Sequence, residues 1–436
     1  MHRGFQRRFA WSELADRRRR LAQTLQGGVA VLQGAGPVAA FHRFRQTNEL
    51  LYLAGVQTPQ AYLVLHADGA SVLYLPHQPT ELPVQDRDLL AQDAELIQTV
   101  TGLDEVRPLE ALPGDLRSKR LIWTPFAPPE TAMTSRDVLL HAERSASLEP
   151  FGPTVSRHRQ FLAALAAACP LAEVRNLTPA LDEMRLVKSP AELSVLREAG
   201  RLSAEAVRQA MLASRPCMNE AEMEAIAFAV FRKGGAQGEG YKTIAPGGPN
   251  IWDGHYCAND RTVPAGEWVL MDCAPDLDGY TSDIGRMWPV DGRYNSWQKE
   301  LYGFVVDVHD ATLARIRPGV LAQQVLDEVR GEMAPLQERT RWSEPAFEQA
   351  TRELLSFRGT FSHPVGMAVH DVGDYWNRPL EPGMVFTIDP QLWIRDRRLY
   401  VRVEDTVAVT EQGVEVLTEG PPRAPEAVEE FLAARC

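Results

Sequence analysis

The segment "WVLMDCAPDLDGYTSDIGRMW", residues 268–288, shows how the second half of this chain is built. Its apolar beginning leads directly into Asp272, and the chain returns through Asp283. Between them, Asp278 and Gly279 form a dipeptide that strongly favours a two-residue hairpin loop. The segment is therefore predicted to be a β-hairpin with one aspartate on each strand.

The loop also predicts the register of this hairpin. With a tip at the Asp-Gly dipeptide, Leu277 pairs with Tyr280. Asp272 then lies opposite Gly285, two residues from Asp283, so the two aspartates are diagonal neighbours on one face. Two carboxylates held on an apolar hairpin repel each other and need protons or cations nearby. On this hairpin alone, a solvent-facing pair at a strand end is an equal alternative.

A second pair of acidic residues is also predicted to lie on the two strands of a hairpin. The segment "MVFTIDP" ends an apolar strand on Asp389, and "LYVRVEDTVAVT" carries Glu404 inside another strand. If Asp396 and Arg397 form the loop tip between them, Asp389 directly opposes Glu404. Arg402 lies two residues before Glu404 on the same face, where its charge favours ionised carboxylates.

Three histidines are candidates for the same site. His363 and His370 lie in "FSHPVGMAVHDVG", whose proline and glycines argue against a helix. In an extended strand, residues seven apart point to opposite faces, so both histidines ligate one metal only if the chain turns between them. His255 lies in a loop rich in glycine and proline. Taken singly, each of them is more often structural than functional.

The acidic residues and one histidine together suit a metal centre. Asp272, Asp283, Asp389 and Glu404 carry four negative charges, which balance two divalent cations. Oxygen and imidazole donors suit Mn²⁺, with Zn²⁺ or Co²⁺ as replacements. Two such ions, ~3.5–4 Å apart, can polarise a carbonyl and activate water. The pattern therefore predicts metal-assisted hydrolysis.

Composition narrows the class of protein. The 436 residues are 44% hydrophobic and 24% charged, as in a globular protein of two or three domains. The net charge of −12 argues against nucleic-acid and anionic-membrane partners. The chain has no apolar run near 18 residues, so no transmembrane helix is expected. The basic beginning lacks an apolar core, and its Arg17–Arg20 run is interpreted as a solvated helix face.

The cysteines indicate the compartment. All five are scattered and form no C-x-x-C motif, so neither a disulfide framework nor a zinc knuckle is expected. Free thiols favour the cytoplasm.

Strand and helix signals suggest that the first part of the chain, up to about residue 170, forms an α/β layered domain. Four apolar segments are predicted as strands, and one segment as the helix that closes this part: strands 29–34, 50–56, 61–66 and 71–76, and helix 159–169. The domain boundary is expected near residues 170–178. Beyond it, Ser189, Pro190 and Glu192 form a strong helix start with a capping box. A further helix is expected at 298–316.

Four segments that carry these residues, "LMDCAPDLDGYTSDIGRMWPVDG", "SHPVGMAVHDVG", "LEPGMVFTIDP" and "VRVEDTVAVT", occur in the order found in metal-dependent proline peptidases. The chain resembles aminopeptidase P and prolidase, which share the pita-bread fold with methionine aminopeptidase and creatinase. "FRQTNELLYLAGVQTPQAYLVL" resembles their amino-terminal domain. The resemblance implies a two-domain α/β (α+β) fold: a small α/β creatinase/prolidase-type domain, 1–172, and a pita-bread catalytic domain, 173–436.

The resemblance also implies roles for individual residues. Five fall on metal-ligand positions: Asp272, Asp283, His363, Asp389 and Glu404. Among them, Asp283 and Glu404 would bridge both ions. His255 and His370 fall on positions that bind substrate and stabilise the oxyanion. Arg378 matches an arginine that grips a substrate carboxylate in prolidase, and Arg402 matches the arginine beside the last ligand.

Several positions depart from the family pattern. Asp389, the implied general base, stands where glutamate is usual, and its side chain is shorter by one carbon–carbon bond, ~1.5 Å. Gln391 replaces a glycine, Gly285 a hydroxyl residue and Gly359 a frequent histidine. The chain reads "TELPVQDRDLL" at 80–90, where some aminopeptidases P carry a tryptophan that walls the proline pocket.

The leading interpretation is a peptidase with two divalent ions, which releases the first residue from peptides with proline in second position. The alternatives are a prolidase, limited to Xaa-Pro dipeptides, a creatinase-like hydrolase and a non-catalytic pita-bread binding protein. Binding proteins of this kind typically lose metal ligands, whereas every ligand position here keeps a coordinating residue. By family resemblance, a homodimer or homotetramer is expected.

Overall fold

The computed structural model of the protein describes residues 4–39, 41–77, 88–152 and 155–434. The chain divides into two compact units, Met1–Arg185 and Leu186–Cys436. The helices in these described ranges are all too short or too polar to cross a membrane.

The first unit contains a mixed sheet with the strand order β4-β3-β2-β1-β5-β6. Antiparallel pairs join β1, β2 and β3, and parallel pairs attach β4, β5 and β6. The strands are β1 (Val29–Gln33), β2 (Tyr62–His66), β3 (Ser71–Leu75), β4 (Glu105–Pro108), β5 (Leu121–Thr124) and β6 (Glu173–Asn176). Because β6 pairs with β5, the first unit continues beyond the boundary expected after residue 172.

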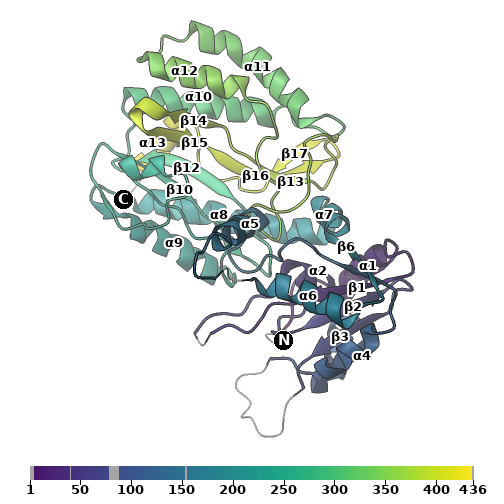
Figure 1. The fold of residues 1–436 in the computed structure, drawn as a ribbon. Coiled ribbons are helices and arrows are strands. Elements are labelled where there is room, and N and C mark those ends of the chain that lie inside the picture. The colour runs from purple at the N-terminus through teal and green to yellow at the C-terminus, as the bar shows by residue number, and fades with distance from the viewer. Residues whose placement is uncertain (1–3, 40, 78–87, 153–154, 435–436) are drawn as a thin grey trace. The chain divides into compact units, whose positions relative to one another are not determined.

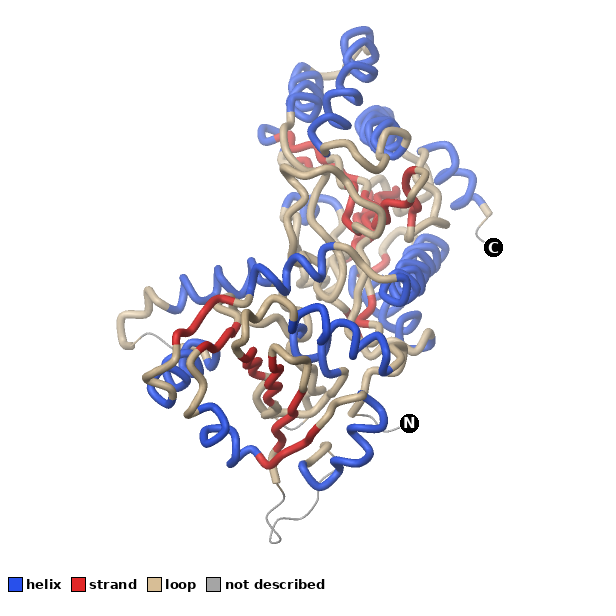
Figure 2. The backbone as a smooth tube through the Cα atoms, turned by 90° about the vertical axis from the view of Figure 1, so that its right-hand side faces the viewer, coloured by secondary structure: helices blue, strands red, loops and turns tan. Residues whose placement is uncertain are grey.

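Helices surround this sheet, as Figure 2 shows. The helices of this part of the chain are α1 (Trp11–Ala22), α2 (Asn48–Ala54), α3 (Ala94–Thr101), α4 (Leu112–Leu116), α5 (Arg136–Ala146), α6 (Arg157–Ala168) and α7 (Thr178–Leu186). Leu116 of α4 and Leu165 of α6 pack on Val31, Val64 and Ile122 of the sheet. Val31 and Val64 are direct partners across β1 and β2, and Ile122 pairs with Val29, two residues from Val31, so all three side chains share one face of the sheet. Helices packed on this face give the layered α/β architecture.

The strand expected at 50–56 is wrong, because residues 50–54 belong to helix α2. A short apolar run fits a buried strand and a buried helix equally well, and here all seven helical residues are buried. Gly55 ends the helix in the left-handed conformation, with φ of 65°.

The interpretation of the arginine run as a solvated face is also wrong for two of its members. Arg17 and Arg18 are buried, while the other two are exposed. Arg17 Nη1 donates to Tyr52 O at 3.1 Å, and Arg18 Nη1 donates to Leu53 O at 2.8 Å. The guanidinium groups thus satisfy the last carbonyls of α2, which have no partner within the helix.

The second unit contains an antiparallel sheet in the order β10-β12-β16-β13, with β17 beside β16. These strands are β10 (Trp268–Asp272), β12 (Ile284–Pro289), β13 (Val385–Ile388), β16 (Glu404–Thr410) and β17 (Gly413–Val416). Shorter strand pairs are formed by β7 (Met218–Asn219), β8 (Gly238–Glu239), β9 (Thr262–Val263), β11 (Pro275–Asp276), β14 (Gln391–Ile394) and β15 (Leu399–Arg402).

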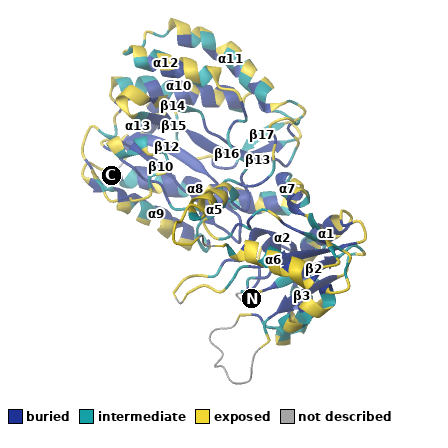
Figure 3. Ribbon diagram, viewed as in Figure 1, coloured by how far each residue is buried: buried dark blue, intermediate teal, exposed yellow. Residues whose placement is uncertain are grey.

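Helices cover both sides of this sheet (Figure 1). They are α8 (Pro190–Ala213), α9 (Glu220–Lys233), α10 (Ser296–Leu313), α11 (Ala322–Arg339), α12 (Pro345–Ser356) and α13 (Pro425–Ala433). Figure 1 shows α8 and α9 on one side and α10, α11 and α12 on the other. Phe304 and Val329 from the second group pack on Phe386 and Val407. Figure 3 shows buried strands beneath helices with exposed outer sides.

The first predicted hairpin has the expected register. Leu277 pairs with Tyr280, and Asp272 pairs with Gly285. The return strand begins only at Ile284, because the chain near the tip pairs with β8 instead of continuing the ladder.

The second predicted hairpin is confirmed as well. Ile394 pairs with Leu399 around a tip at residues 396–397, and Gln391 pairs with Arg402. The same register continues in β13 and β16, where Ile388 pairs with Asp405. The predicted start of α8 is also correct, since Ser189 and Glu192 form the reciprocal capping box.

A buried ion pair joins two strands of this sheet to α10. Arg286 Nη2 donates to both oxygens of Asp405, at 2.8 and 3.0 Å, and Nη1 donates to Glu404 O at 2.6 Å. His309 Nε2 lies 3.2 Å from Asp405 Oδ2. Burial acts to raise the pKa of Asp405, but Arg286 and, after it, the neighbouring His309 hold this pKa well below its usual range. The carboxylate therefore depends on its partners to remain ionised.

Replacement of Arg286 by methionine should lower the free energy of unfolding by ~3–5 kcal/mol, because a buried charge loses its partner. Chemical denaturation followed by tryptophan fluorescence measures the change. Arg197→Met is the matched control: Arg197 and Glu415 pair at 2.7 Å on the exposed surface, and their loss should cost less than ~1 kcal/mol. Equal losses in both variants would contradict the importance of the buried pair.

Candidate metal centre

The acidic residues predicted from the hairpins lie at the ends of neighbouring strands. Asp272 is the last residue of β10, and Asp283 directly precedes β12. Glu404 is the first residue of β16, and Asp389 directly follows β13. Because these four strands are successive neighbours in one sheet, their ends bring the four carboxylates together.

His363 completes a compact group with two of the carboxylates. Asp283, His363 and Glu404 each offer a ligand atom, and these atoms lie within 4.8 Å of one another. His363 Nε2 is 3.5 Å from Asp283 Oδ2 and 3.9 Å from Glu404 Oε1. One imidazole and two carboxylates at such separations could hold a metal ion.

Arg402 lies close to three of the four carboxylates. Its Nη1 lies 3.1 Å from Glu404 Oε2 and 3.6 Å from Asp389 Oδ2, and its Nη2 contacts Asp272 Oδ2. The arginine expected to favour ionised carboxylates is thus in contact with three of them.

Tyr241 is a site residue that the sequence analysis missed. Its hydroxyl lies 2.6 Å from Asp283 Oδ1 and also contacts Asp272 Oδ1. The segment that carries it runs beside β10, where Ile244 forms a bridge with Asp272. The contacts of Tyr241 with Asp272 and Asp283 join residues 31 and 42 positions apart in the chain. No periodic pattern or motif marks Tyr241, so the sequence alone offered no means of finding it.

The electrostatics of the cluster favour cations. Burial, and after it the neighbouring Glu404, raise the pKa of Asp283 and Asp389 well above their usual range. Burial also raises the pKa of Glu404, although Arg402 opposes this. Among the described residues, Asp389 Oδ1 and Glu404 Oε1 have no hydrogen-bond partner. One guanidinium cannot balance four carboxylates, so the residues present fit divalent cations.

The chain turns between His363 and His370. Gly366 N donates to Ala368 O at 3.2 Å, and the following segment folds back on Pro364. The two imidazole rings are consequently only 4.2 Å apart, instead of on opposite faces as an extended strand would place them. His255 is exposed, and its ring lies 6.2 Å from that of His370. The His370 ring therefore lies near the rings of both His363 and His255, and His363 in turn lies close to two of the carboxylates.

The remaining expectations concern Arg378, Gly285 and the stretch at 80–90. Arg378 Nη2 donates to Glu381 Oε1 at 2.6 Å, and its role toward a substrate carboxylate stays a prediction. Gly285 gives the acidic cluster room, because a Cβ there would lie 3.1 Å from Glu404 Cβ. Most of the 80–90 stretch lies outside the described residues.

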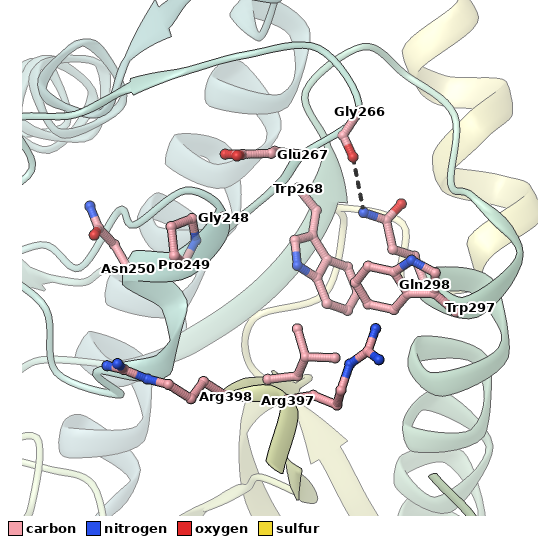
Figure 4. A pocket seen from close by; sticks show the side chains of 11 residues that line it. Gly248, Pro249, Asn250, Gly266, Glu267, Trp268, Trp297, Gln298, Arg397 and Arg398 are labelled. Atoms are coloured by element: carbon pink, nitrogen blue, oxygen red, sulfur yellow. Dashed lines mark hydrogen bonds between the residues drawn. The ribbon is translucent and has the colours of Figure 1, made fainter. Parts of the chain in front are cut away.

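A separate cavity of about 540 Å³ lies in the same unit (Figure 4). Its lining includes Trp268 and Trp297, which meet edge to face at 5.1 Å, together with Arg397 and Arg398. The nine predicted site residues do not line it, so the cavity is distinct from the candidate metal centre.

Comparisons with known proteins agree with a metal centre in the second unit. The family profile described as metallopeptidase family M24 matches residues 194–411, and the aminopeptidase P, N-terminal domain profile matches residues 14–120. The chain is 29% identical to a Xaa-Pro aminopeptidase of Escherichia coli over 97% of this chain and 98% of that protein. It is 28% identical to the mitochondrial intermediate cleaving peptidase 55 of Arabidopsis thaliana, over 97% and 83%.

Solved structures extend the likeness to three dimensions. The structure of E. coli aminopeptidase P with the inhibitor Pro-Leu has a TM-score of 0.79 and 27% identity, covering 98% of this chain and 99% of that chain. Proline aminopeptidase P II from Yersinia pestis has a TM-score of 0.78 and 29% identity, over 98% and 100%. The expected fold is confirmed: an aminopeptidase P-type amino-terminal domain precedes a pita-bread catalytic domain. With its profile match over the catalytic half, the chain belongs to metallopeptidase family M24.

Proposed function

We propose that this chain is a metal-dependent Xaa-Pro aminopeptidase, which releases the first residue from peptides that carry proline in second position. Relatives named Xaa-Pro aminopeptidase, which match nearly the whole chain, support the substrate class. The observation that carries the proposal is the meeting of four buried carboxylates beside His363. Asp389 Oδ1 and Glu404 Oε1 remain open for ligands among the described residues.

Five residues would hold two divalent ions, most simply Mn²⁺, with Zn²⁺ or Co²⁺ as replacements: Asp272, Asp283, His363, Asp389 and Glu404. When bound, such ions polarise a carbonyl and lower the pKa of water. Tyr241 and Arg402 would orient these carboxylates through the contacts that they make with Asp272.

Proton movement in the reaction falls to Asp389. Its Oδ1, at the end of β13, would accept a proton from the attacking water and return it to the leaving proline nitrogen. His255 and His370 would donate ring N–H groups to the substrate and to the developing oxyanion. The His370 ring, 4.2 Å from that of His363 and 6.2 Å from that of His255, supports this division of roles.

Prolidase is the second candidate, and Arg378 is the observation that favours it. The Arg378 guanidinium would bind the free carboxylate of a dipeptide, although the end of a longer peptide would also reach it. The expected homodimer or homotetramer and the cytoplasmic location stay predictions.

A peptide panel with and without added Mn²⁺ separates these functions. We expect cleavage of Xaa-Pro-Xaa-Xaa peptides at the bond before proline, with strong loss after chelation, since the reaction needs the ions. Chromatography of the products measures both the bond and the rate. Cleavage confined to Xaa-Pro dipeptides would identify a prolidase. An absence of turnover in a fully metallated preparation would favour the binding-protein alternative.

Replacement of Asp283 by asparagine should reduce the bound Mn²⁺ below two ions per chain and lower kcat by at least the ~10–100-fold that loss of a metal site's outer partner costs. The amide removes the charge that the cations require. Metal analysis of the purified protein and steady-state kinetics give the two readouts. Asp396→Asn, at the exposed tip of the second hairpin, is the control and should change neither. Unchanged stoichiometry in Asp283→Asn would remove this residue from the ligand set.

A further inference from the structure

Three residues that follow one another at alternate positions form a chain of contacts that leads into the metal centre. Asp389 follows β13, while Gln391 and Trp393 lie on β14. Side chains two residues apart in a strand point to the same face, so these three can touch in sequence. This contact chain lies wholly within the second unit.

The hydrogen bonds determine how the Gln391 amide is oriented. Trp393 Nε1 donates to Gln391 Oε1 at 3.1 Å, and Gln391 Nε2 donates to Asp389 Oδ2. An indole N–H can only donate, and a carboxylate oxygen can only accept. The amide therefore has one orientation that satisfies both neighbours, with its oxygen toward Trp393 and its NH₂ group toward Asp389.

The indole at the far end of this chain is itself held in place. Trp393 pairs with Tyr400 across the β14–β15 ladder, and their ring centroids are 4.1 Å apart. Trp252 meets the same indole edge to face at 5.3 Å. Contacts from two directions thus orient the donor that fixes the Gln391 amide.

The consequence falls on the two oxygens of Asp389. Oδ2 contacts Gln391 and lies 3.6 Å from Arg402 Nη1, whereas Oδ1 has no hydrogen-bond partner among the described residues. A carboxylate is planar, so an anchor on one oxygen also sets the direction of the other. A functional site must hold its groups within ~0.5 Å of the productive geometry.

We propose that Gln391 is a positioning residue for Asp389: it holds Oδ2 so that Oδ1 faces the centre, and Trp393 acts through Gln391 by fixing its amide. The inference rests on the proposed function of this site and adds to it a defined support for the general base. Neither side chain touches the substrate in this role, and their effect passes entirely through Asp389.

Gln391→Met tests the proposal, because methionine keeps the length and much of the volume but neither donates nor accepts in the same way. In the full chain, calorimetry with Mn²⁺ should show affinity ~10–100-fold weaker, and kcat should fall by a similar factor with a smaller change in KM. Gln349→Met is the matched control. Gln349 Nε2 donates to Glu353 Oε1 at 2.8 Å on the exposed side of α12, and its loss should leave both values unchanged.

Trp393→Phe is the second variant and keeps a ring beside Tyr400 while removing the N–H donor. We expect a smaller loss of Mn²⁺ affinity and kcat than in Gln391→Met, and no further loss when the two substitutions are combined. Thermal melting of each variant without metal checks that the fold is retained. Should Gln391→Met fail to fold, Trp393→Phe alone decides: wild-type affinity and kcat there overturn the proposal.

The outcomes separate this inference from the proposed function. A wild-type chain that binds Mn²⁺ and cleaves Xaa-Pro peptides, with a Gln391→Met variant that does both equally well, overturns the positioning role alone. Losses that add fully in the double variant overturn the part assigned to Trp393. A wild-type chain that binds none of Mn²⁺, Zn²⁺ and Co²⁺ overturns the proposed function, and the positioning role with it.

Discussion

The mutual repulsion of buried carboxylates is the constraint on which the rest of this molecule depends. Asp272, Asp283, Asp389 and Glu404 meet where four neighbouring strands end, in surroundings that disfavour their charge. A chain that places such groups together must hold them rigidly, or they turn outward into water. The sheet supplies this rigidity, because each acidic residue directly adjoins a ladder whose strands are buried.

Further polar side chains surround the four carboxylates. Arg286 holds Asp405, the residue next to Glu404, while Arg402 and Tyr241 touch the carboxylates themselves. Each of these partners comes from a different part of the chain. The orientation of the acidic groups is therefore determined by several partners together. Asp389 and Gln391, which both depart from the family pattern, are in direct contact with each other.

Local rules predicted the two hairpins well. The Asp-Gly turn and strict strand alternation were enough to pair Asp272 with Gly285 and to place the register around Asp389 and Glu404 correctly. The same rules failed for 50–56, where an apolar run has no period to distinguish a buried helix from a strand. They also could not show Tyr241 or the burial of Arg17, because both depend on contacts between distant segments.

The order of the strands along the chain affects when the acidic cluster forms during folding. The acidic residues enter the sheet from Asp272 to Glu404, and β16 lies between β12 and β13 in the finished sheet. Such non-local pairing forms late in folding. A chain emerging from the ribosome thus lacks Glu404, one of the four carboxylates, until this central strand is made. A polypeptide that ends before β16 therefore lacks both this carboxylate and the strand that joins β12 to β13, so its acidic cluster stays incomplete.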